Sequence, residues 1–217
     1  MLTERIDTWI FDLDNTLYSA PDFFPQIPAR IHSFTAEFLG LGAEEAQRVQ
    51  KDYLRRYGTT MNGLMIEHGL DPEPYLAFVH DVDFSRLGED RELDGLLERL
   101  PGRKLIYTNG SLGHAEKVLE RLGVTRHFEA TFDITAANYR PKPAPEAYDA
   151  LCQRHAIAPA RALFVEDTVR NLTPAASLGM TTVWLRHDDP DTHINLDESA
   201  VHHTITDLKV WLRELLD

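Results

Sequence analysis

The sequence is poor in cysteine and contains no long hydrophobic run. Its 217 residues include one cysteine, Cys152, so the chain cannot form an internal disulfide, as is usual for proteins of a reducing compartment. No run of about 20 consecutive apolar residues occurs, so we expect no transmembrane helix. Residues 1–14 lack the basic and apolar regions of a signal peptide. These absences predict a cytoplasmic protein with no membrane partner.

Basic residues are also scarce. The chain has 22 Lys and Arg against 35 Asp and Glu, which gives a formal net charge of −13. Proteins that bind nucleic-acid polymers or anionic membranes need basic patches, so this balance argues against both partners. A small anionic substrate would need positive charge supplied locally. With 217 residues, of which 43% are hydrophobic, the chain suits one large domain or a core with a smaller insertion. We expect it to act as a monomer or a homodimer.

Short apolar runs alternate with helical patterns over much of the chain. The runs predict strands at 7–11, 104–108, 130–134, 162–166 and 181–185. Helical periodicity and capping residues predict helices at 111–123, 144–156, 171–179 and 207–216. This alternation predicts an α/β fold, a Rossmann-like parallel sheet with helices on both faces. Ligands of such sheets bind at the carboxyl ends of the strands.

The interval 19–88 differs, because it has helical periodicity and almost no strand signal. It lies between the first and the second predicted strand and begins shortly after Asp12 and Asp14. We therefore expect an α/β core formed by residues 1–18 and 89–217, with residues 19–88 inserted as a small all-helical cap. An insertion at this point would lie over the strand ends like a lid.

Polar segments follow the predicted strands at four places. They are Asp12-Leu13-Asp14-Asn15-Thr16, Thr108-Asn109-Gly110, Arg140-Pro141-Lys142-Pro143, and Glu166-Asp167 with Asn171 just beyond. Parallel strands would bring these segments together at one edge of the sheet. Their acids repel each other and resist burial, so the cluster needs positive charge. A hard divalent cation such as Mg²⁺ would offset them and accept carboxylate and phosphate oxygens together.

The other groups at these strand ends suit a phosphoryl group. Lys142 offers charge and Thr108 a hydroxyl, and the start of the helix after Ser111 offers free N–H groups. Each segment alone also fits an ordinary turn, cap or solvated surface. A calcium loop at Asp12 is excluded, because Leu17 stands where the glycine of the sharp turn belongs and Phe23 where the bidentate glutamate belongs.

Taken together, the four segments resemble the four motifs of the haloacid dehalogenase-like hydrolase superfamily. The resemblance covers almost the whole chain, and the helical insertion resembles the first type of cap in that superfamily. The stretches FDLDNTLY (11–18), YGTTMNGL (57–64) and RPKP (140–143) are also similar to the pyrimidine 5′-nucleotidase subgroup.

This resemblance implies a role for each motif residue. Asp12 is expected to attack phosphorus and form an aspartyl-phosphate. Asp14 is expected to protonate the leaving oxygen and then to activate water, while its backbone carbonyl binds the metal. The residues expected to hold the phosphoryl oxygens are Thr108, Asn109 and Lys142. The expected Mg²⁺ ligands are Asp12, Asp14 and Asp167, with Glu166 and Asn171 around them.

The expected function is a Mg²⁺-dependent phosphatase of a small phosphate monoester, with a pyrimidine nucleoside 5′-monophosphate favoured. Phosphoglycolate, a sugar phosphate or a phosphomutase reaction are alternatives. The dehalogenases of the superfamily lack an acid at the place of Asp14, because a halide leaves without a proton. A binding protein on an inactive core is disfavoured by the intact acids and lysine. The residues expected to shape the substrate pocket are Tyr18, Tyr57, Thr60 and Asn62.

Overall fold

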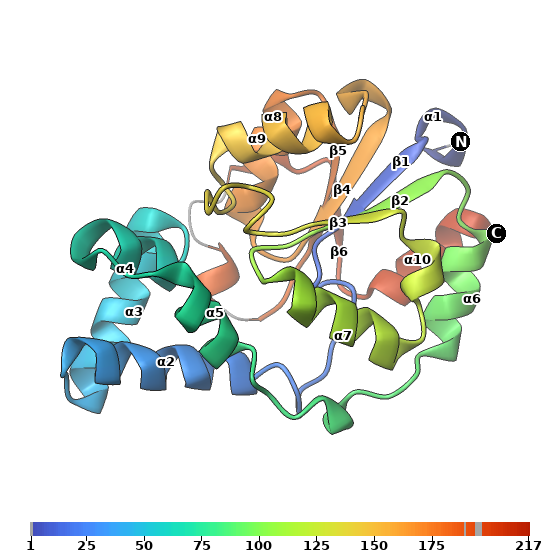
Figure 1. Cartoon of the computed structure of the whole chain (residues 1–217). Coiled ribbons are helices and arrows are strands. Elements are labelled where there is room, and N and C mark those ends of the chain that lie inside the picture. The colour runs from blue at the N-terminus through green and yellow to red at the C-terminus, as the bar shows by residue number, and fades with distance from the viewer. Residues whose placement is uncertain (1, 189, 194–196) are drawn as a thin grey trace.

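The computed structural model describes residues 2–188, 190–193 and 197–217, and it confirms the α/β fold predicted from the sequence (Figure 1). Within these residues one parallel sheet has the strand order β3-β2-β1-β4-β5-β6. The strands are β1 (Thr8–Phe11), β2 (Arg103–Tyr107), β3 (Ala130–Phe132), β4 (Ala162–Glu166), β5 (Thr181–Leu185) and β6 (His203–Ile205). Five of them lie where the apolar runs predicted strands. The edge strand β6 was missed because its three residues, HTI, contain no apolar run.

Helices cover both faces of this sheet, which explains why β1 and β4 are buried along their whole length. One face packs against α6 (Arg91–Arg99), α7 (Leu112–Leu122) and α10 (Leu208–Leu216). The other packs against α8 (Pro145–Arg154) and α9 (Leu172–Ser177). Figure 1 shows the two groups on opposite sides of the strands. The hydrophobic core therefore forms two layers, and the sheet lies between them.

Local capping sets the helix boundaries that matter for the site. The Ser111 hydroxyl accepts a hydrogen bond from the backbone N–H of His114, and α7 ends at Gly123, whose φ of 76° is left-handed. Asp207 caps α10 in the same way, through the backbone N–H of Val210. Both helices were predicted within one residue of these bounds. The remaining short elements are α1 (Leu2–Arg5), η1 (Phe84–Arg86), η2 (Thr125–His127), η3 (Pro159–Arg161), η4 (Val169–Asn171), η5 (Pro190–His193) and η6 (Glu198–Ala200).

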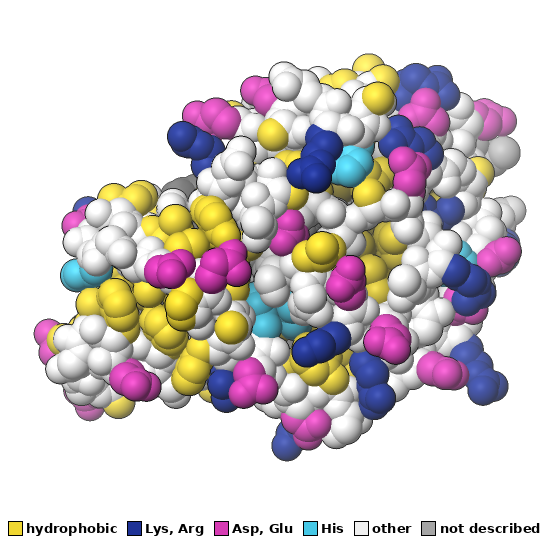
Figure 2. Space-filling model, in the orientation of Figure 1, with side chains coloured by type: hydrophobic (Ala, Val, Ile, Leu, Met, Phe, Trp, Pro, Cys, Tyr) yellow, Lys and Arg dark blue, Asp and Glu magenta, His cyan; other side chains and the backbone are white. Residues whose placement is uncertain are grey.

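Four α-helices lie between β1 and α6 in the sequence and form a separate group in space (Figure 1). They are α2 (Gln26–Leu39), α3 (Ala43–Tyr57), α4 (Thr60–His68) and α5 (Pro72–Val79). Their buried side chains form a third hydrophobic cluster, which also includes Ile134 from the loop after β3. Figure 2 shows hydrophobic side chains gathered over this group. Two large hydrophobic residues of its helices, Phe38 and Ile66, are exposed. Among the described residues, no helix has the length and hydrophobicity that a membrane span requires.

The helical group contacts the sheet domain through the α3–α4 turn. The Arg170 guanidinium, which follows β4, donates to the carbonyls of Leu54 (2.7 Å) and Gly58 (2.9 Å). Gly58 has a φ of 86°, and a Cβ there would lie 2.9 Å from the carbonyl oxygen of Lys142. Glycine is therefore required for the turn to approach the Lys142 backbone so closely. These contacts hold the helical group beside the carboxyl ends of the strands.

Candidate active site

The topology brings the first, second and fourth polar segments to the same edge of the sheet. β1 pairs with β2 on one side and with β4 on the other, and all three run in the same direction. Asp12 follows β1 and its backbone N–H donates to Val165 of β4 at 2.9 Å. Thr108 follows β2, and Glu166 ends β4. Asp12 therefore lies between the threonine and the Glu166-Asp167 pair, as the parallel sheet predicted.

Three carboxylates form a buried cluster at this edge. Asp12, Glu166 and Asp167 each place a carboxylate oxygen within 4.8 Å of the others. Burial and the charge of Glu166 raise the pKa of Asp12 to about 7. Burial and neighbouring acids likewise raise the pKa of Glu166 to about 7 and that of Asp167 to about 6. The nearby positive charge therefore does not balance the three carboxylates. Their hard oxygen donors fit a divalent cation such as Mg²⁺.

Lys142 supplies the positive charge inside the cluster. Its ammonium lies 2.6 Å from Asp12 Oδ1 and 2.6 Å from Glu166 Oε2, and it also donates to the carbonyl of Tyr107 at 3.0 Å. The side chain is only 2% exposed. Burial alone would lower the pKa of Lys142, but the two carboxylates raise it above its ordinary value, so the ammonium stays charged. The lysine therefore joins the segments after β1, β3 and β4.

Asn109 positions the backbone of Lys142. Its side-chain oxygen accepts the Lys142 N–H at 2.8 Å, and its amide donates to the Lys142 carbonyl at 3.5 Å. The neighbouring Thr108 hydroxyl accepts the N–H of Gly110 at 2.9 Å and is almost fully buried. Thr108 and Asn109 thus lie beside the cluster, and Asn109 is bound to the lysine loop.

Asp14 lies apart from the three-carboxylate cluster, with its side chain turned toward other partners. Its Oδ1 accepts hydrogen bonds from the Tyr18 hydroxyl at 2.5 Å and from His114 Nε2 at 2.8 Å. Burial alone would raise the pKa of Asp14, but these donors offset it and hold the pKa below its usual value. Binding of the metal by the Asp14 backbone carbonyl stays a prediction.

Asparagines lie next to the acid cluster. Asn15, whose φ is 62°, donates to Asp167 Oδ2 at 3.1 Å. Asn171 is 6% exposed, and its side-chain oxygen is buried without a hydrogen-bond partner among the described residues. Such an orphaned oxygen close to a carboxylate cluster is a further polar group that a cation or its hydration shell would satisfy.

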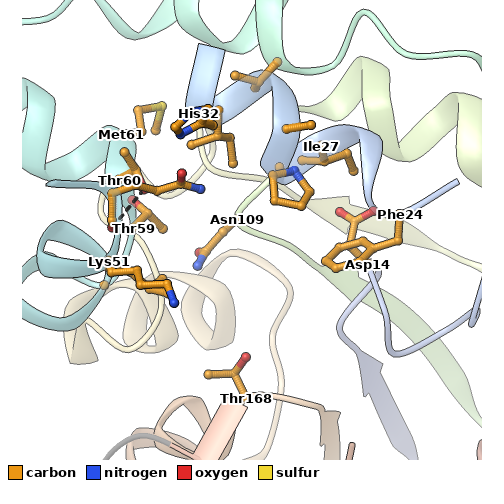
Figure 3. A pocket seen from close by; sticks show the side chains of 18 of the residues that line it. Asp14, Phe24, Ile27, His32, Lys51, Thr59, Thr60, Met61, Asn109 and Thr168 are labelled. Atoms are coloured by element: carbon orange, nitrogen blue, oxygen red, sulfur yellow. Dashed lines mark hydrogen bonds between the residues drawn. The ribbon is translucent and has the colours of Figure 1, made fainter. Parts of the chain in front are cut away.

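A cavity of about 910 Å³ opens between the strand ends and the helical group (Figure 3). Asp14, Asn109 and Thr168 face it from the sheet domain, and apolar side chains of α2 and α4 line it opposite, including Ile27 and Met61. Lys51 extends into the cavity from α3, on the side of Asn109 and Thr168. The cavity also receives the polar side chains of His32, Gln47 and Gln50.

Of the four residues expected to shape the substrate pocket, Thr60 lines this cavity. The other three, all within the described residues, do not line it. The Tyr18 hydroxyl binds Asp14, Tyr57 donates its hydroxyl to Glu67, and the Asn62 amide donates to the Tyr57 carbonyl at 2.8 Å. These three side chains hold neighbouring parts of the protein. Contact of these four residues with a substrate stays a prediction.

Three residues at the site were not predicted from the sequence, because their placement depends on tertiary packing. His114 lies in the first turn of α7, one turn after the Ser111 cap, and this spacing was the only signal that it faces the strand ends. Lys51 belongs to a charged helix whose orientation the sequence does not reveal. Arg170 follows the Glu166-Asp167 pair but bonds to the helical group.

Comparisons with known proteins agree with this geometry. A family model described as haloacid dehalogenase-like hydrolase matches residues 6–179. "Phosphate metabolism protein 8" of Saccharomyces cerevisiae is 29% identical over 194 residues, which cover 79% of this chain but only 59% of the yeast protein. "N-acetylmuramic acid 6-phosphate phosphatase" of Pseudomonas aeruginosa is 26% identical over 227 residues, covering 98% of this chain and 94% of that protein.

A solved structure shares the fold across the chain. The crystal structure of a haloacid dehalogenase-like phosphatase from Thermococcus onnurineus superposes with a TM-score of 0.66 at 21% identity. The match covers 97% of this chain and 98% of that one. At this identity the likeness establishes the fold alone.

Proposed function

The chain belongs to the haloacid dehalogenase-like hydrolase family, and from this membership we propose that it is a Mg²⁺-dependent phosphatase of a small phosphate monoester. The observation that carries the proposal is the bridge from Lys142 to Asp12 and Glu166, 2.6 Å on each side, beside the acid cluster. One ammonium among three acids suits a site completed by a cation and a phosphoryl group. The yeast and Pseudomonas relatives, named for phosphate metabolism and for a phosphatase, support the same class.

In this proposal Asp12 is the nucleophile. One of its carboxylate oxygens forms a bond to phosphorus, the bond from phosphorus to the ester oxygen breaks, and the electron pair stays on the leaving oxygen. Lys142 compensates charge on the phosphoryl oxygens, assisted by Thr108 and Asn109 at the adjacent strand end. Splitting hydrolysis into two displacements lowers the barrier of a reaction that is very slow without a catalyst.

Asp14 is the proposed acid and base, and its Oδ2 atom carries the proton that is transferred. It protonates the leaving oxygen in the first step and removes a proton from the attacking water in the second. Its pKa is below the usual value in the free protein, so it starts as a carboxylate. The negative charge of a bound phosphate monoester, whose second pKa is about 6, favours its protonation on substrate binding. A halide leaving group needs no proton, so Asp14 favours phosphatase over dehalogenase chemistry.

Mg²⁺ is the cation we propose, because the available donors are carboxylate oxygens. Asp12 and Asp167 would hold it, with the Asp14 carbonyl as a further ligand and Glu166 and Asn171 beside it. When bound, it compensates the acid cluster and the phosphoryl charge. The raised pKa values of all three acids support the need for this charge.

We propose that residues 19–88 act as a cap that closes over the substrate. The body of the substrate would fill the cavity of about 910 Å³ beside the apolar wall of α2 and α4. Lys51, Gln47 and Gln50 would bind its polar edge. We favour a pyrimidine nucleoside 5′-monophosphate, because the flat face of its base would pack on the apolar wall and the polar edge of the base would meet these three side chains. A sugar phosphate is the second candidate, because the relative named for N-acetylmuramic acid 6-phosphate aligns with nearly the whole chain.

The test is phosphate release from a panel of monoesters: UMP, CMP, AMP, N-acetylmuramic acid 6-phosphate, glucose 6-phosphate and phosphoglycolate. We expect turnover with Mg²⁺, none in EDTA, and full recovery when Mg²⁺ is restored. Highest kcat/KM for UMP or CMP would support the nucleotide assignment, and a preference for a sugar phosphate would replace it. Chelator-resistant turnover would contradict the metal site, and halide release from 2-chloropropionate without phosphate release would contradict the phosphatase.

A further inference from the structure

Both hydrogen bonds to the Asp14 side chain fall on the same oxygen. Oδ1 accepts from the Tyr18 hydroxyl at 2.5 Å and from His114 Nε2 at 2.8 Å. Across residues 2–188, 190–193 and 197–217, no hydrogen bond reaches Oδ2. The Asp14 side chain is 20% exposed and lines the cavity (Figure 3). An oxygen that already accepts two hydrogen bonds is a poor site for a proton, so a proton on this carboxyl resides on Oδ2.

His114 is held rigidly while it makes this contact. Its side chain is fully buried. Three rings enclose the imidazole: His80 at a centroid distance of 4.4 Å, Phe84 at 5.8 Å and Phe23 at 6.3 Å. His80 is in turn fixed by Ser111, whose hydroxyl lies 3.0 Å from His80 Nδ1. All three enclosing rings come from the segment between β1 and α6, so this segment fixes the imidazole that bonds to Asp14.

The burial of His114 has a cost that packing alone does not explain. Its Nδ1 is buried without a hydrogen-bond partner within the described part of the chain. A phenylalanine would fill the same aromatic surroundings without leaving a polar atom unsatisfied. The polar contact that a histidine gains here, and a phenylalanine would lose, is the bond from Nε2 to Asp14.

We propose that His114 is a positioning residue, which with Tyr18 turns the Asp14 carboxyl so that Oδ2 faces the ester oxygen of the substrate. This inference rests on the proposed acid role of Asp14 in phosphate ester hydrolysis. His114 donates one hydrogen bond throughout and exchanges no proton with the substrate. Its loss leaves Asp14 in place but lets the carboxyl rotate, so the proton is delivered less often to the leaving oxygen.

The test varies the leaving group, because a basic leaving oxygen needs the proton and an acidic one needs it little. We compare phenyl phosphate with p-nitrophenyl phosphate through kcat/KM, which reports only the steps up to phosphoenzyme formation. In His114→Phe, which keeps the ring packing, we expect kcat/KM to fall about 10- to 100-fold more for phenyl phosphate. Tyr18→Phe should change the ratio in the same direction, and His114→Gln, which restores an N–H donor, should recover part of it.

Phe84→Leu is the matched control, because Phe84 packs on His114 at a centroid distance of 5.8 Å and its side chain forms no hydrogen bond. Any loss in this variant should be equal for both substrates. Equal losses for both substrates in His114→Phe and in Tyr18→Phe would overturn the inference, and Tyr18→Phe alone decides the matter if His114→Phe does not fold.

Asp14→Asn separates this inference from the function beneath it. If kcat/KM falls more for phenyl phosphate than for p-nitrophenyl phosphate in Asp14→Asn but not in the His114 and Tyr18 variants, the positioning role is wrong and the acid role stands. If Asp14→Asn lowers kcat/KM equally for both substrates, the acid role itself fails, and the positioning role fails with it.

Discussion

Asp12→Asn is expected to lower phosphate release by about 10⁴-fold or more, measured as kcat for p-nitrophenyl phosphate with Mg²⁺. An amide oxygen is a poor nucleophile toward phosphorus, and it is a weaker ligand for a divalent cation. The choice of substrate matters, because p-nitrophenolate leaves with little help from an acid. The loss therefore reports the nucleophile and not the proton donor.

The fold of this variant should survive. Lys142 keeps its bond to Glu166 Oε2 at 2.6 Å when Asp12 loses its charge, and one source of repulsion in the cluster disappears. We expect a Tm in EDTA no lower than that of the unmodified protein. Asp133→Asn is the matched control: Asp133 is another buried acid, but it binds the backbone N–H groups of Leu112 and Ala136. It should lower stability and keep turnover, and near-normal turnover in Asp12→Asn would refute the nucleophile.

Lys142→Met is expected to destabilise the protein by about 3–5 kcal/mol at neutral pH in EDTA, besides abolishing turnover. Removal of the ammonium leaves Asp12 and Glu166 buried and unpaired. For a chain of this size, a Tm lower by about 10 °C corresponds to such a loss. Calorimetry or thermal denaturation followed by circular dichroism would measure it. Mg²⁺ should recover part of the stability but none of the activity.

The loss of stability in Lys142→Met should also depend on pH. The pKa values of Asp12 and Glu166 are raised to about 7 in the folded protein, above those of the unfolded chain. The cost of burying their charges is therefore complete above the folded pKa and disappears as the pH falls toward the unfolded value. Lys142 lowers both pKa values in the unmodified protein, so its removal should raise them further, and the Tm deficit of Lys142→Met relative to the unmodified protein should shrink as the pH falls from about 8 to about 5.5.

Lys104→Met is the control for this effect. Lys104 is also buried, but within the described residues its ammonium donates to the carbonyls of Leu100 and Gly102 and to no carboxylate. Its loss removes no hydrogen-bonded partner from a buried carboxylate and should give a deficit that is nearly independent of pH over the same range. A pH-independent deficit in Lys142→Met would mean that the two acids are not charged partners of the lysine.

The fold was largely predictable because each central strand is a continuous apolar run. β1 and β4 are buried on both faces, so their sequences, TWIF and ALFVE, carry a strong signal. β6 has three residues at the edge of the sheet and is mostly exposed, so no such signal exists for it. The gathering of Asp12, Lys142 and Glu166-Asp167 followed from the same logic, since parallel strands end at one edge.

The surroundings of Asp14 and the cavity wall were not predictable in the same way. The contact from His114 to Asp14 joins residues 100 positions apart and depends on the rotation of α7 about its axis. Lys51 lines the cavity from α3, and α3 is joined to the sheet domain by the bond from Arg170 to the Leu54 carbonyl, between residues 116 positions apart. The hydrogen bonds from the Tyr57 hydroxyl to Glu67 and from the Asn62 amide to the Tyr57 carbonyl depend on packing in the same way, and contact of these two residues with a substrate stays a prediction.

The central claim is that the phosphoryl group passes through Asp12, and a trapping experiment tests it most directly. Asp14→Asn, mixed with radiolabelled p-nitrophenyl phosphate and Mg²⁺, should form the phosphoenzyme quickly but hydrolyse it slowly, because its base is missing. We expect acid quenching to recover about one label per chain, on the peptide that contains Asp12. Release of labelled phosphate with no labelled protein, or a label on another residue, would contradict the account.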